Sequence, residues 1–384
     1  MMFDFLFDYA VLRVIWWLLL GVLLAGFAMT DGFDLGVGAL LPFVAKTDAE
    51  RRVAINTVGP VWEGNQVWFI LGGGAIFAAW PALYALSFSG FYLAMFLVLL
   101  ALILRPVGFK YRSKKPDPAW RQRWDIALFI GGLVPSLIFG VAIGNALQGV
   151  PFHFTSDLRP IYEGTLFGLL NPLALYCGLV SLAMLAMHGA AWLAFKAEGI
   201  VAARAARFGA TAAVLTALLF LGGGFLVRFG LLGGYAVTSP IAWADPSNPL
   251  YKTVSVDPAA WHANFAAVPL LWVVPGLGIA AALLAALGFK ARQGGLTMLA
   301  SLLSVGMIVA TVGISMFPIL LPSSTNPNHS LAVFDASSSL STLRTMLFAT
   351  LVFMPLVLAY TAWVYKVLWG KVTVETIDAG TTSY

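Results

Sequence analysis

The chain is poor in charge and almost free of cysteine. Only 10% of its 384 residues are Asp, Glu, Lys or Arg, and Cys177 is its single cysteine. A soluble domain normally carries about 25% charged residues, so an ordinary soluble fold is excluded. One cysteine excludes an intrachain disulfide and a cysteine metal cluster. The four histidines show no metal-ligand spacing within a helix, and no P-loop or dinucleotide fingerprint is present.

Apolar residues make up 60% of the chain and gather in long runs. A helix needs about 20 predominantly apolar residues to cross the hydrocarbon core of a membrane. We therefore predict an all-α polytopic membrane protein, a single integral membrane domain over residues 1–384 with nine transmembrane helices. The N-terminus lacks the basic region of a secretory signal, so we expect a true first span rather than a cleaved signal. The nine stretches are 11–41, 55–79, 82–104, 124–147, 165–195, 206–229, 264–289, 297–321 and 342–369.

Lysine and arginine are unevenly distributed between these spans. Seventeen of the 22 follow spans one, three, five, seven and nine, which places them all on one side of the membrane. The positive-inside rule then predicts a periplasmic N-terminus and a cytoplasmic C-terminus. The net charge of +5 is explained by these loops, so no nucleic-acid partner is expected. The 17 are Lys46, Arg51, Arg52, Arg105, Lys110, Arg112, Lys114, Lys115, Arg121, Arg123, Lys196, Arg204, Arg207, Lys290, Arg292, Lys366 and Lys371.

Acidic residues inside the predicted spans are the strongest functional signal. Asp31 and Asp34 lie in the first span, and Glu63 opens the second. With a turn at about 43–54, Asp34 and Glu63 would each lie roughly 10–15 Å from it, at 1.5 Å per residue. Two carboxyl groups at matching depth on adjacent helices could meet. Ionisable groups in the membrane are costly and commonly belong to proton routes.

An interfacial interpretation of the same residues remains open. Pro42 and Pro60 could end or begin these helices early. Glu63 would then lie in the first turn of a helix at the wet interface, stabilised by the helix dipole. Asp34 could in that case pair with Arg51 or Arg52.

Two further groups favour helix packing over chemistry. Asn65 and Gln66, close to Glu63, are expected to hydrogen-bond across helices. His188 is the only histidine within a predicted span. It is more readily explained by a helix–helix hydrogen bond than by haem ligation.

Five motifs resemble those of one protein family, in the same order along the chain. They are G-F-A-M-T-D-G-F-D-L-G-V-G, W-E-G-N-Q-V-W, L-R-P-V-G-F-K-Y-R-S-K, G-N-A-L-Q-G-V-P-F and M-F-P-I-L-L-P-S-S. Together they closely resemble subunit II of cytochrome bd-type quinol oxidases, from about Val11 to Tyr384. The resemblance implies two four-helix bundles plus one additional helix. It also implies a location in the bacterial inner membrane.

The resemblance also implies partners and cofactors. Family members pair with a larger subunit I, which holds two haems b and one haem d and oxidises quinol. Subunit II binds no haem, although some relatives hold a structural ubiquinone. The complex reduces oxygen to water with protons from the cytoplasm. Small single-span subunits and lipid are further possible partners.

At matching motif positions, the resemblance makes Asp34, Trp62 and Glu63 candidates for a proton path. Asp31, beside Asp34, is added as a candidate, and Trp68 is a candidate for an oxygen route. The position of Glu63 is Asp in some relatives, which keeps a titratable carboxyl. Lys110 stands where some relatives have Asp, which argues against an acidic proton antenna there.

Two other classes of function fit the residues alone. A proton- or cation-coupled secondary transporter would also have intramembrane carboxylates and glycine-interrupted helices. A purely structural membrane partner would have no chemistry of its own. The absorption spectrum of a purified complex separates the oxidase from the transporter.

Overall fold

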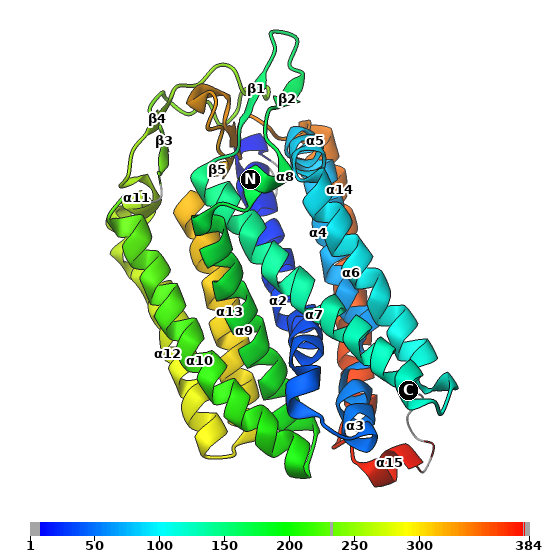
Figure 1. The fold of residues 1–384 in the computed structure, drawn as a ribbon. Coiled ribbons are helices and arrows are strands. Elements are labelled where there is room, and N and C mark those ends of the chain that lie inside the picture. Colours follow the sequence, from blue (N-terminus) through cyan, green and yellow to red (C-terminus); the bar gives the residue numbers. More distant parts are fainter. Residues whose placement is uncertain (1–7, 231–232, 379, 381–384) are drawn as a thin grey trace.

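The computed structural model describes residues 8–230, 233–378 and 380, and its long helices run side by side (Figure 1). The α-helices are α2 (Tyr9–Val44), α3 (Asp48–Val58), α4 (Trp62–Ala79), α5 (Pro81–Gly90), α6 (Tyr92–Tyr111), α7 (Pro118–Gln148), α8 (Leu166–Leu169), α9 (Pro172–Lys196), α10 (Gly199–Arg228), α11 (Ala263–Ala267), α12 (Val273–Lys290), α13 (Gly294–Met316), α14 (Leu340–Val367) and α15 (Val374–Asp378). Four short 3-10 helices are η1 (Arg112–Lys114), η2 (Ala260–His262), η3 (Pro269–Trp272) and η4 (Pro327–His329).

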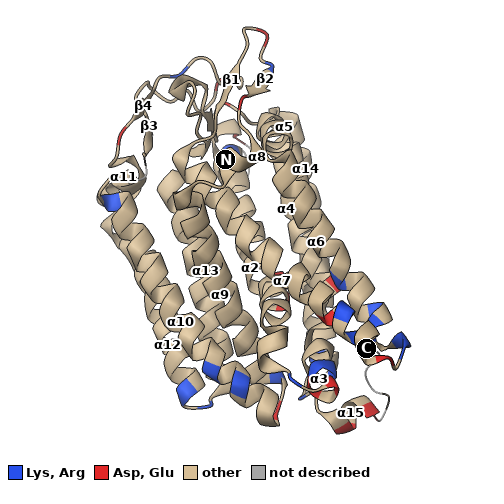
Figure 2. Ribbon diagram, viewed as in Figure 1, with Lys and Arg blue, Asp and Glu red and all other residues tan. Residues whose placement is uncertain are grey.

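Short strands form three antiparallel hairpins outside the long helices. The pairs are β1 (Phe152–Phe154) with β2 (Pro160–Tyr162), β3 (Tyr235–Val237) with β4 (Val254–Val256), and β5 (Ile319–Leu321) with β6 (Leu331–Ala332). They lie at one end of the helices, which we call the hairpin end (Figure 1). The opposite end carries α3 and α15, and lysine and arginine gather there (Figure 2), so we call it the basic end.

Eight helical stretches within the described residues are long and apolar enough to cross a membrane, which confirms the all-α polytopic prediction. The expected second span corresponds to α4, which has 18 residues and runs from the basic end towards the hairpin end (Figure 1). Its first turns contain Glu63, Asn65 and Gln66, which lower its mean hydropathy. The number nine therefore stays a prediction. The eight stretches are Tyr9–Val44, Tyr92–Lys114, Pro118–Gln148, Pro172–Lys196, Gly199–Arg228, Pro269–Lys290, Gly294–Met316 and Leu340–Val367.

Five predicted spans end or break differently from the sequence prediction, namely 55–79, 82–104, 165–195, 264–289 and 297–321. The stretch 55–79 is divided between α3 and α4 around Pro60, which has no N–H for a helical hydrogen bond. The turn expected at 43–54 instead contains most of α3, whose start is fixed by a capping box of Thr47 and Glu50. The stretch 82–104 is divided between α5 and α6 at Phe91. The span expected over 297–321 ends at Met316, because a helix rarely continues into the residue before a proline, here Pro318.

The helices form two groups and one outlying helix. α9, α10, α12 and α13 pack on one another as a four-helix bundle. In the second group α2 contacts α4 and α7, and α6 contacts α7. α14 lies outside both groups, against α2 and α4. This arrangement agrees with the two bundles and additional helix that the family resemblance implies.

Glycines allow α2 to pack closely between α7 and α9. A Cβ atom on Gly36 would lie 1.9 Å from the carbonyl oxygen of Leu185 on α9. A Cβ atom on Gly132 of α7 would lie 2.5 Å from the backbone nitrogen of Ala39 on α2. Small residues at such contacts are what lets membrane helices approach closely. They fix the position of α2, which carries Asp31 and Asp34.

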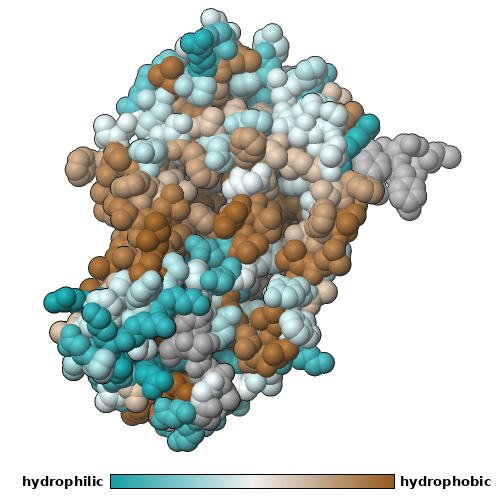
Figure 3. Space-filling model, turned by 90° about the vertical axis from the view of Figure 1, so that its right-hand side faces the viewer, coloured by the Kyte–Doolittle hydropathy of each residue, from teal (hydrophilic) through white to brown (hydrophobic). Residues whose placement is uncertain are grey.

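The outer surface of the helices is strongly apolar. Figure 3 shows a brown hydrophobic band between more hydrophilic ends on the face that carries α6 and α14. Large side chains on α14 point outwards, and Phe348, Leu351 and Phe353 are each more than 60% exposed (69%, 63% and 63%). Such a band matches the hydrocarbon core of a membrane.

Buried charges tie the loops of the hairpin end to the helices. Arg13 of α2 is fully buried and donates to the carbonyl oxygen of Asp245 (2.8 Å) and the hydroxyl of Ser337 (2.8 Å). Lys252 and Asp335 form a buried ion pair of 2.6 Å between two loops. Burial lowers the pKa of Lys252 and raises the pKa of Asp335. These contacts pack the described parts of the loops against the end of α2 and against one another.

Candidate functional site

Asp31 and Asp34 lie on α2 and face a single arginine, Arg105 of α6. Arg105 donates from Nη1 to Oδ2 of Asp31 (3.0 Å) and from Nη2 to Oδ1 of Asp31 (2.7 Å). Its Nη2 atom also lies 3.8 Å from Oδ2 of Asp34. All three side chains are at most 3% exposed. We call Asp31, Asp34 and Arg105 the inner ion cluster.

The sequence prediction placed Arg105 in a cytoplasmic loop, and this was wrong. α6 continues past Pro106 to Tyr111, so Arg105 lies inside the helix and points at α2. Its charge is matched by Asp31, which allows an arginine to be buried where it would otherwise be very costly.

Asp34 is bound on one side only. Its Oδ2 atom accepts a hydrogen bond from Nδ2 of Asn65 on α4 (2.8 Å). The Oδ1 atom of Asn65 in turn accepts from the hydroxyl of Tyr365 on α14 (2.7 Å). Oδ1 of Asp34 is buried and has no hydrogen-bond partner among the described residues. The expected role of Asn65 in hydrogen bonding across helices is confirmed.

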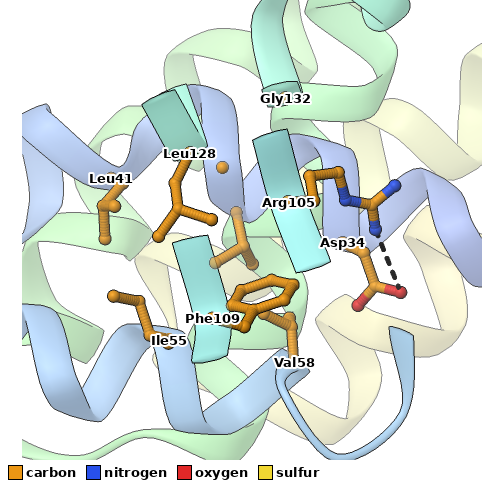
Figure 4. Close-up of a pocket in the computed structure, with 10 residues that line it drawn as sticks. Asp34, Leu41, Ile55, Val58, Arg105, Phe109, Leu128 and Gly132 are labelled. Atoms are coloured by element: carbon orange, nitrogen blue, oxygen red, sulfur yellow. Dashed lines mark ion pairs between the residues drawn. The ribbon is translucent and has the colours of Figure 1, made fainter. Parts of the chain in front are cut away.

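A small cavity lies beside Asp34 (Figure 4). Its volume is about 10 Å³. A cavity needs roughly 10–15 Å³ of such space to hold one water molecule. Among the described residues, Asp34 and Arg105 are the charged ones that line it. The others are Val37, Gly38, Leu41, Ile55, Val58, Phe109, Leu128 and Gly132.

Trp62 lies close to the inner ion cluster but makes no polar contact with it. The guanidinium carbon of Arg105 lies 6.0 Å from the centre of a Trp62 ring, at the outer limit of a cation–π contact. The ring of Phe109 packs against Trp62 with 5.7 Å between centroids. The indole N–H of Trp62 is buried and has no acceptor among the described residues.

Glu63 does not join Asp34 in this chain. It lies in the first turn of α4 and is exposed, whereas Asp34 is buried and bound to Asn65 instead. The first-turn position expected from Pro60 is therefore confirmed for Glu63, and its place at the membrane interface stays a prediction.

The companion expectation for Asp34, pairing with Arg51 or Arg52, was wrong. Arg51 forms an ion pair with Asp125 (2.9 Å), and Arg52 lies 3.4 Å from Asp378. α2 also passes through Pro42 to Val44, which keeps Asp34 well inside the helix.

A second group of charges lies at the basic end, where α3, η1 and α7 meet. Arg112 donates to Oδ1 of Asp48 (2.8 Å) and forms an ion pair with Asp125, which also binds Arg51. Arg121 pairs with the other oxygen of Asp48. We call Asp48, Arg51, Arg112, Arg121 and Asp125 the outer ion cluster. Sequence analysis treated its arginines only as markers of the cytoplasmic side and did not identify Asp48 or Asp125.

Trp68 and His188 are both buried in helix contacts. Trp68 of α4 packs on α2, where a Cβ atom on Gly26 would lie 2.8 Å from its ring. His188 bonds through Nδ1 to Ser301 Oγ (2.9 Å) and through Nε2 to the carbonyl oxygen of Met29 (2.9 Å). The interpretation of His188 as a helix–helix hydrogen bond is confirmed. Both of its ring nitrogens are occupied, so it does not fit a haem ligand.

The fold and the site define a polytopic α-helical membrane protein with a buried ionisable cluster. The family model for cytochrome bd terminal oxidase subunit II matches residues 12–368. The chain is 49% identical to a probable cytochrome oxidase subunit 2 of Haemophilus influenzae, over 97% of this chain and 98% of that one. It is 47% identical to cytochrome bd-I ubiquinol oxidase subunit 2 of Escherichia coli K12, over 98% and 99% of the two chains.

The solved bd oxidase from Geobacillus thermodenitrificans has a chain of similar fold, with a TM-score of 0.69 and 16% identity. The match covers 93% of this chain and 98% of that chain. The chain therefore belongs to the cytochrome bd terminal oxidase subunit II family. It is a subunit of a respiratory oxidase and a multi-pass protein of the bacterial inner membrane. These findings favour the oxidase over the secondary transporter.

Proposed function

We propose that this chain is the haem-free subunit of a quinol:oxygen oxidoreductase and conducts protons from the cytoplasm towards its haem-bearing partner. Two quinols and one oxygen molecule give two quinones and two water molecules in such a reaction. The four protons that enter water must reach a buried site. A membrane subunit beside that site can supply part of the path.

The observation that carries the proposal is the unpartnered Oδ1 atom of Asp34. One guanidinium faces two carboxylates, so the inner ion cluster carries one net negative charge when all three groups are ionised. A proton on Asp34 removes that charge without breaking the bidentate pair of Asp31 and Arg105. Uncompensated charge in a membrane interior is expensive, and such residues are typically functional. Asp34 is thus the group in this cluster best arranged to gain and lose a proton.

The other predicted path residues have different surroundings and therefore different proposed roles. Asp31 uses both oxygens on Arg105 and holds that side chain beside Asp34. Trp62 covers the cluster on the α4 side. Glu63 is exposed on α4 near the basic end, where its carboxyl could exchange protons with water or with the partner.

The same proposal assigns the redox groups to the partner. Two haems b and one haem d would lie in the larger subunit I, which would also oxidise quinol. In the described part of this chain, no group of three or more His, Cys, Asp and Glu residues is arranged to hold a metal ion. A structural ubiquinone, bound lipid and small single-span subunits remain expectations from the family.

Orientation and oxygen access are further parts of the proposal. Lysine and arginine gather at the basic end (Figure 2), which supports a cytoplasmic basic end and C-terminus and a periplasmic hairpin end. Trp68 is proposed to line an oxygen route. The Trp68 ring packs closely on Gly26 of α2. The test of this role is to measure how turnover depends on oxygen concentration in a Trp68 variant.

The test compares variants that keep shape but cannot titrate. Asn and Gln retain hydrogen bonding but have no ionisable carboxyl, so Asp34→Asn and Glu63→Gln should each slow quinol oxidation with haem content unchanged. Glu63→Asp keeps the carboxyl and should retain much of the activity. Glu198→Gln, which removes an exposed carboxyl at the basic end, serves as the control and should have normal turnover. Quinol oxidase rates and haem spectra are measured on the same preparations, and normal turnover in an Asp34→Asn, Glu63→Gln double variant would end the proton-path proposal.

A further inference from the structure

Two hydrogen bonds connect Asp34 of α2 with the outlying helix α14. Asn65 of α4 donates from Nδ2 to Oδ2 of Asp34 (2.8 Å), and its own Oδ1 atom accepts from the hydroxyl of Tyr365 on α14 (2.7 Å). Asp34 and Asn65 are both buried. The three side chains therefore form one continuous chain of hydrogen bonds across three helices, and it ends on the carboxyl to which the proposed function assigns proton transfer.

The direction of both hydrogen bonds follows from the chemistry of the groups. An ionised carboxylate only accepts, whereas an amide accepts through its oxygen and donates through its nitrogen. Asp34 as a carboxylate therefore requires the nitrogen of Asn65, and the amide oxygen is left facing Tyr365, which donates to it. A reversed amide would place its oxygen against Asp34, where it could accept only from a protonated carboxyl.

Tyr365 is held in place by packing on α9. Its ring lies edge-on to the ring of Trp192, with 6.2 Å between centroids and 90° between planes. Trp192 is itself fixed, because it stacks on Phe33 of α2 (4.1 Å between centroids) and donates from its indole N–H to the carbonyl oxygen of Thr57 (3.1 Å). Most residues of α14 are exposed, so Tyr365 reaches inward from a helix whose other side chains largely face outwards.

We propose that Tyr365 is a positioning residue for Asp34: its hydroxyl locks the amide of Asn65 as a donor, and this lock lets Asp34 release each proton that it takes up. The inference rests on the proposed function of Asp34 and adds the group that controls release. A hydrogen bond to the charged form of a carboxyl favours that form. An amide held with its nitrogen towards Asp34 favours the carboxylate, whereas a reversed amide would accept from the protonated carboxyl and retain the proton.

The proton step itself is balanced within Asp34. Its Oδ2 atom is held by Asn65, so an O–H bond forms at Oδ1 on uptake and the same bond breaks on release. Asn65 and Tyr365 keep their own hydrogens throughout. Only a proton moves, so no oxidant or reductant is needed.

Removing the hydroxyl unlocks the amide. In the native chain, reversal would leave the hydroxyl of Tyr365 without its acceptor, and an unpaired buried donor is costly. Phenylalanine has no such donor, so the reversed amide becomes accessible and the protonated form of Asp34 gains a hydrogen bond. Tyr365→Phe should therefore raise the proton affinity of Asp34 about fivefold, which moves the midpoint of its titration about 0.7 pH unit upward.

The charges around Asp34 are unchanged in this variant. The nearest are Asp31 on the same helix and Arg105 on α6. A shift in the titration of Asp34 in Tyr365→Phe is therefore due to the hydroxyl and not to a nearby charge. The ionisable side chains on other helices around α2 include Glu63 of α4, Asp125 of α7, His188 of α9 and Tyr365 of α14.

The measurement is the infrared difference spectrum of the assembled complex, titrated with pH. The C=O stretching band of protonated Asp34 is identified by its loss in Asp34→Asn. Tyr360→Phe is the matched control, because Tyr360 lies on the same helix and is 65% exposed, so its midpoint should equal that of the native complex. An upward shift in Tyr365→Phe alone supports the lock, and an unchanged or lower midpoint overturns it.

Asn65→Ala shows whether Tyr365 acts through the amide. This variant removes the donor to Asp34, so the midpoint should rise here as well. Adding Tyr365→Phe should then leave the midpoint where Asn65→Ala alone places it, because no amide remains to be locked. A further shift in the double variant would mean that Tyr365 acts on Asp34 by another route, and this overturns the proposal.

Turnover on the same preparations separates this inference from the proposed function. Quinol oxidation should be slower in Tyr365→Phe and normal in Tyr360→Phe, and a shifted titration with normal turnover overturns the role in proton release. If Asp34→Asn is slow while Tyr365→Phe titrates like the native complex, the proton path stands without the lock. If Asp34→Asn turns over normally, or no band is lost in it, the proton path and the role of Tyr365 fail together.

Discussion

Arg105 provides a direct test of how the inner ion cluster is held together. It is at most 3% exposed, makes two hydrogen bonds to Asp31 and lies 3.8 Å from Asp34. Arg105→Met keeps a long side chain but removes the positive charge. Asp31 and Asp34 would then be two buried carboxyls with no cation beside them. We expect this variant to be strongly destabilised.

The size of the effect follows from the geometry. A unit charge about 4 Å from an opposite charge gains roughly 4 kcal/mol at an effective dielectric constant of 20. Much of that gain offsets desolvation, and removing one partner of a buried pair typically costs about 3–5 kcal/mol. For a large chain, each kcal/mol of lost stability lowers the midpoint of thermal denaturation by about 2 °C. The midpoint of this variant should therefore fall by roughly 6–10 °C.

A double variant separates charge from packing. Asp31→Leu, Arg105→Met removes one charge of each sign and leaves Asp34 with its hydrogen bond from Asn65. Replacing a buried ion pair by apolar residues is often nearly neutral, so the double variant should recover at least half of the lost stability. Thermal denaturation of the purified complex, followed through its haem absorbance, gives the comparison. A single variant as stable as the native complex, or a double variant no better than the single, would refute this account of the cluster.

Two further predictions concern packing and orientation. Gly36→Ala should sharply reduce the yield of assembled complex, because its Cβ atom would lie 1.9 Å from the carbonyl oxygen of Leu185. Gly21→Ala on the same helix has nothing within 4 Å of its Cβ atom and should assemble normally, so equal yields would contradict the packing argument. Cysteine replacing Ser324 at the hairpin end should be labelled from outside intact cells, whereas cysteine replacing Ser113 at the basic end should not. Labelling at 113 without 324 would show that the orientation is reversed.

Several features of the site could be predicted from local sequence. The intramembrane position of Asp34 follows from an acidic residue within a long apolar run. The hydrogen-bonding roles of Asn65 and His188 follow from polar side chains inside spans. These predictions hold because each depends only on the residue and its depth in the membrane.

The pairing of the charges could not be predicted in this way. Arg105 and Asp31 are 74 residues apart, as are Arg51 and Asp125. Arg105 also sits at the end of an apolar run, where it resembles an ordinary cytoplasmic flank. Helix α3 was missed for a different reason. It is short and polar, with a mixed sequence D-A-E-R-R-V-A-I-N-T-V, so the sequence predicts a turn over its first part and the start of a membrane span over its last four residues. Only tertiary packing shows that Ile55 and Val58 of this helix close the cavity next to Asp34.

The position of α3 changes how Asp34 can be reached from the cytoplasm. A simple two-span hairpin would leave a wet turn below Asp34 and Glu63, and the two carboxyls would be equally accessible. In the observed fold α3 lies in that region, Glu63 remains exposed on α4, and Asp34 is buried beside a cavity that Val58 of α3 also lines. A buried acid exchanges protons only when water or another titratable group reaches it. For the proposed proton path, α3 is therefore part of the surroundings that separate Asp34 from the basic end, and the chemistry of Asp34 alone does not describe that path.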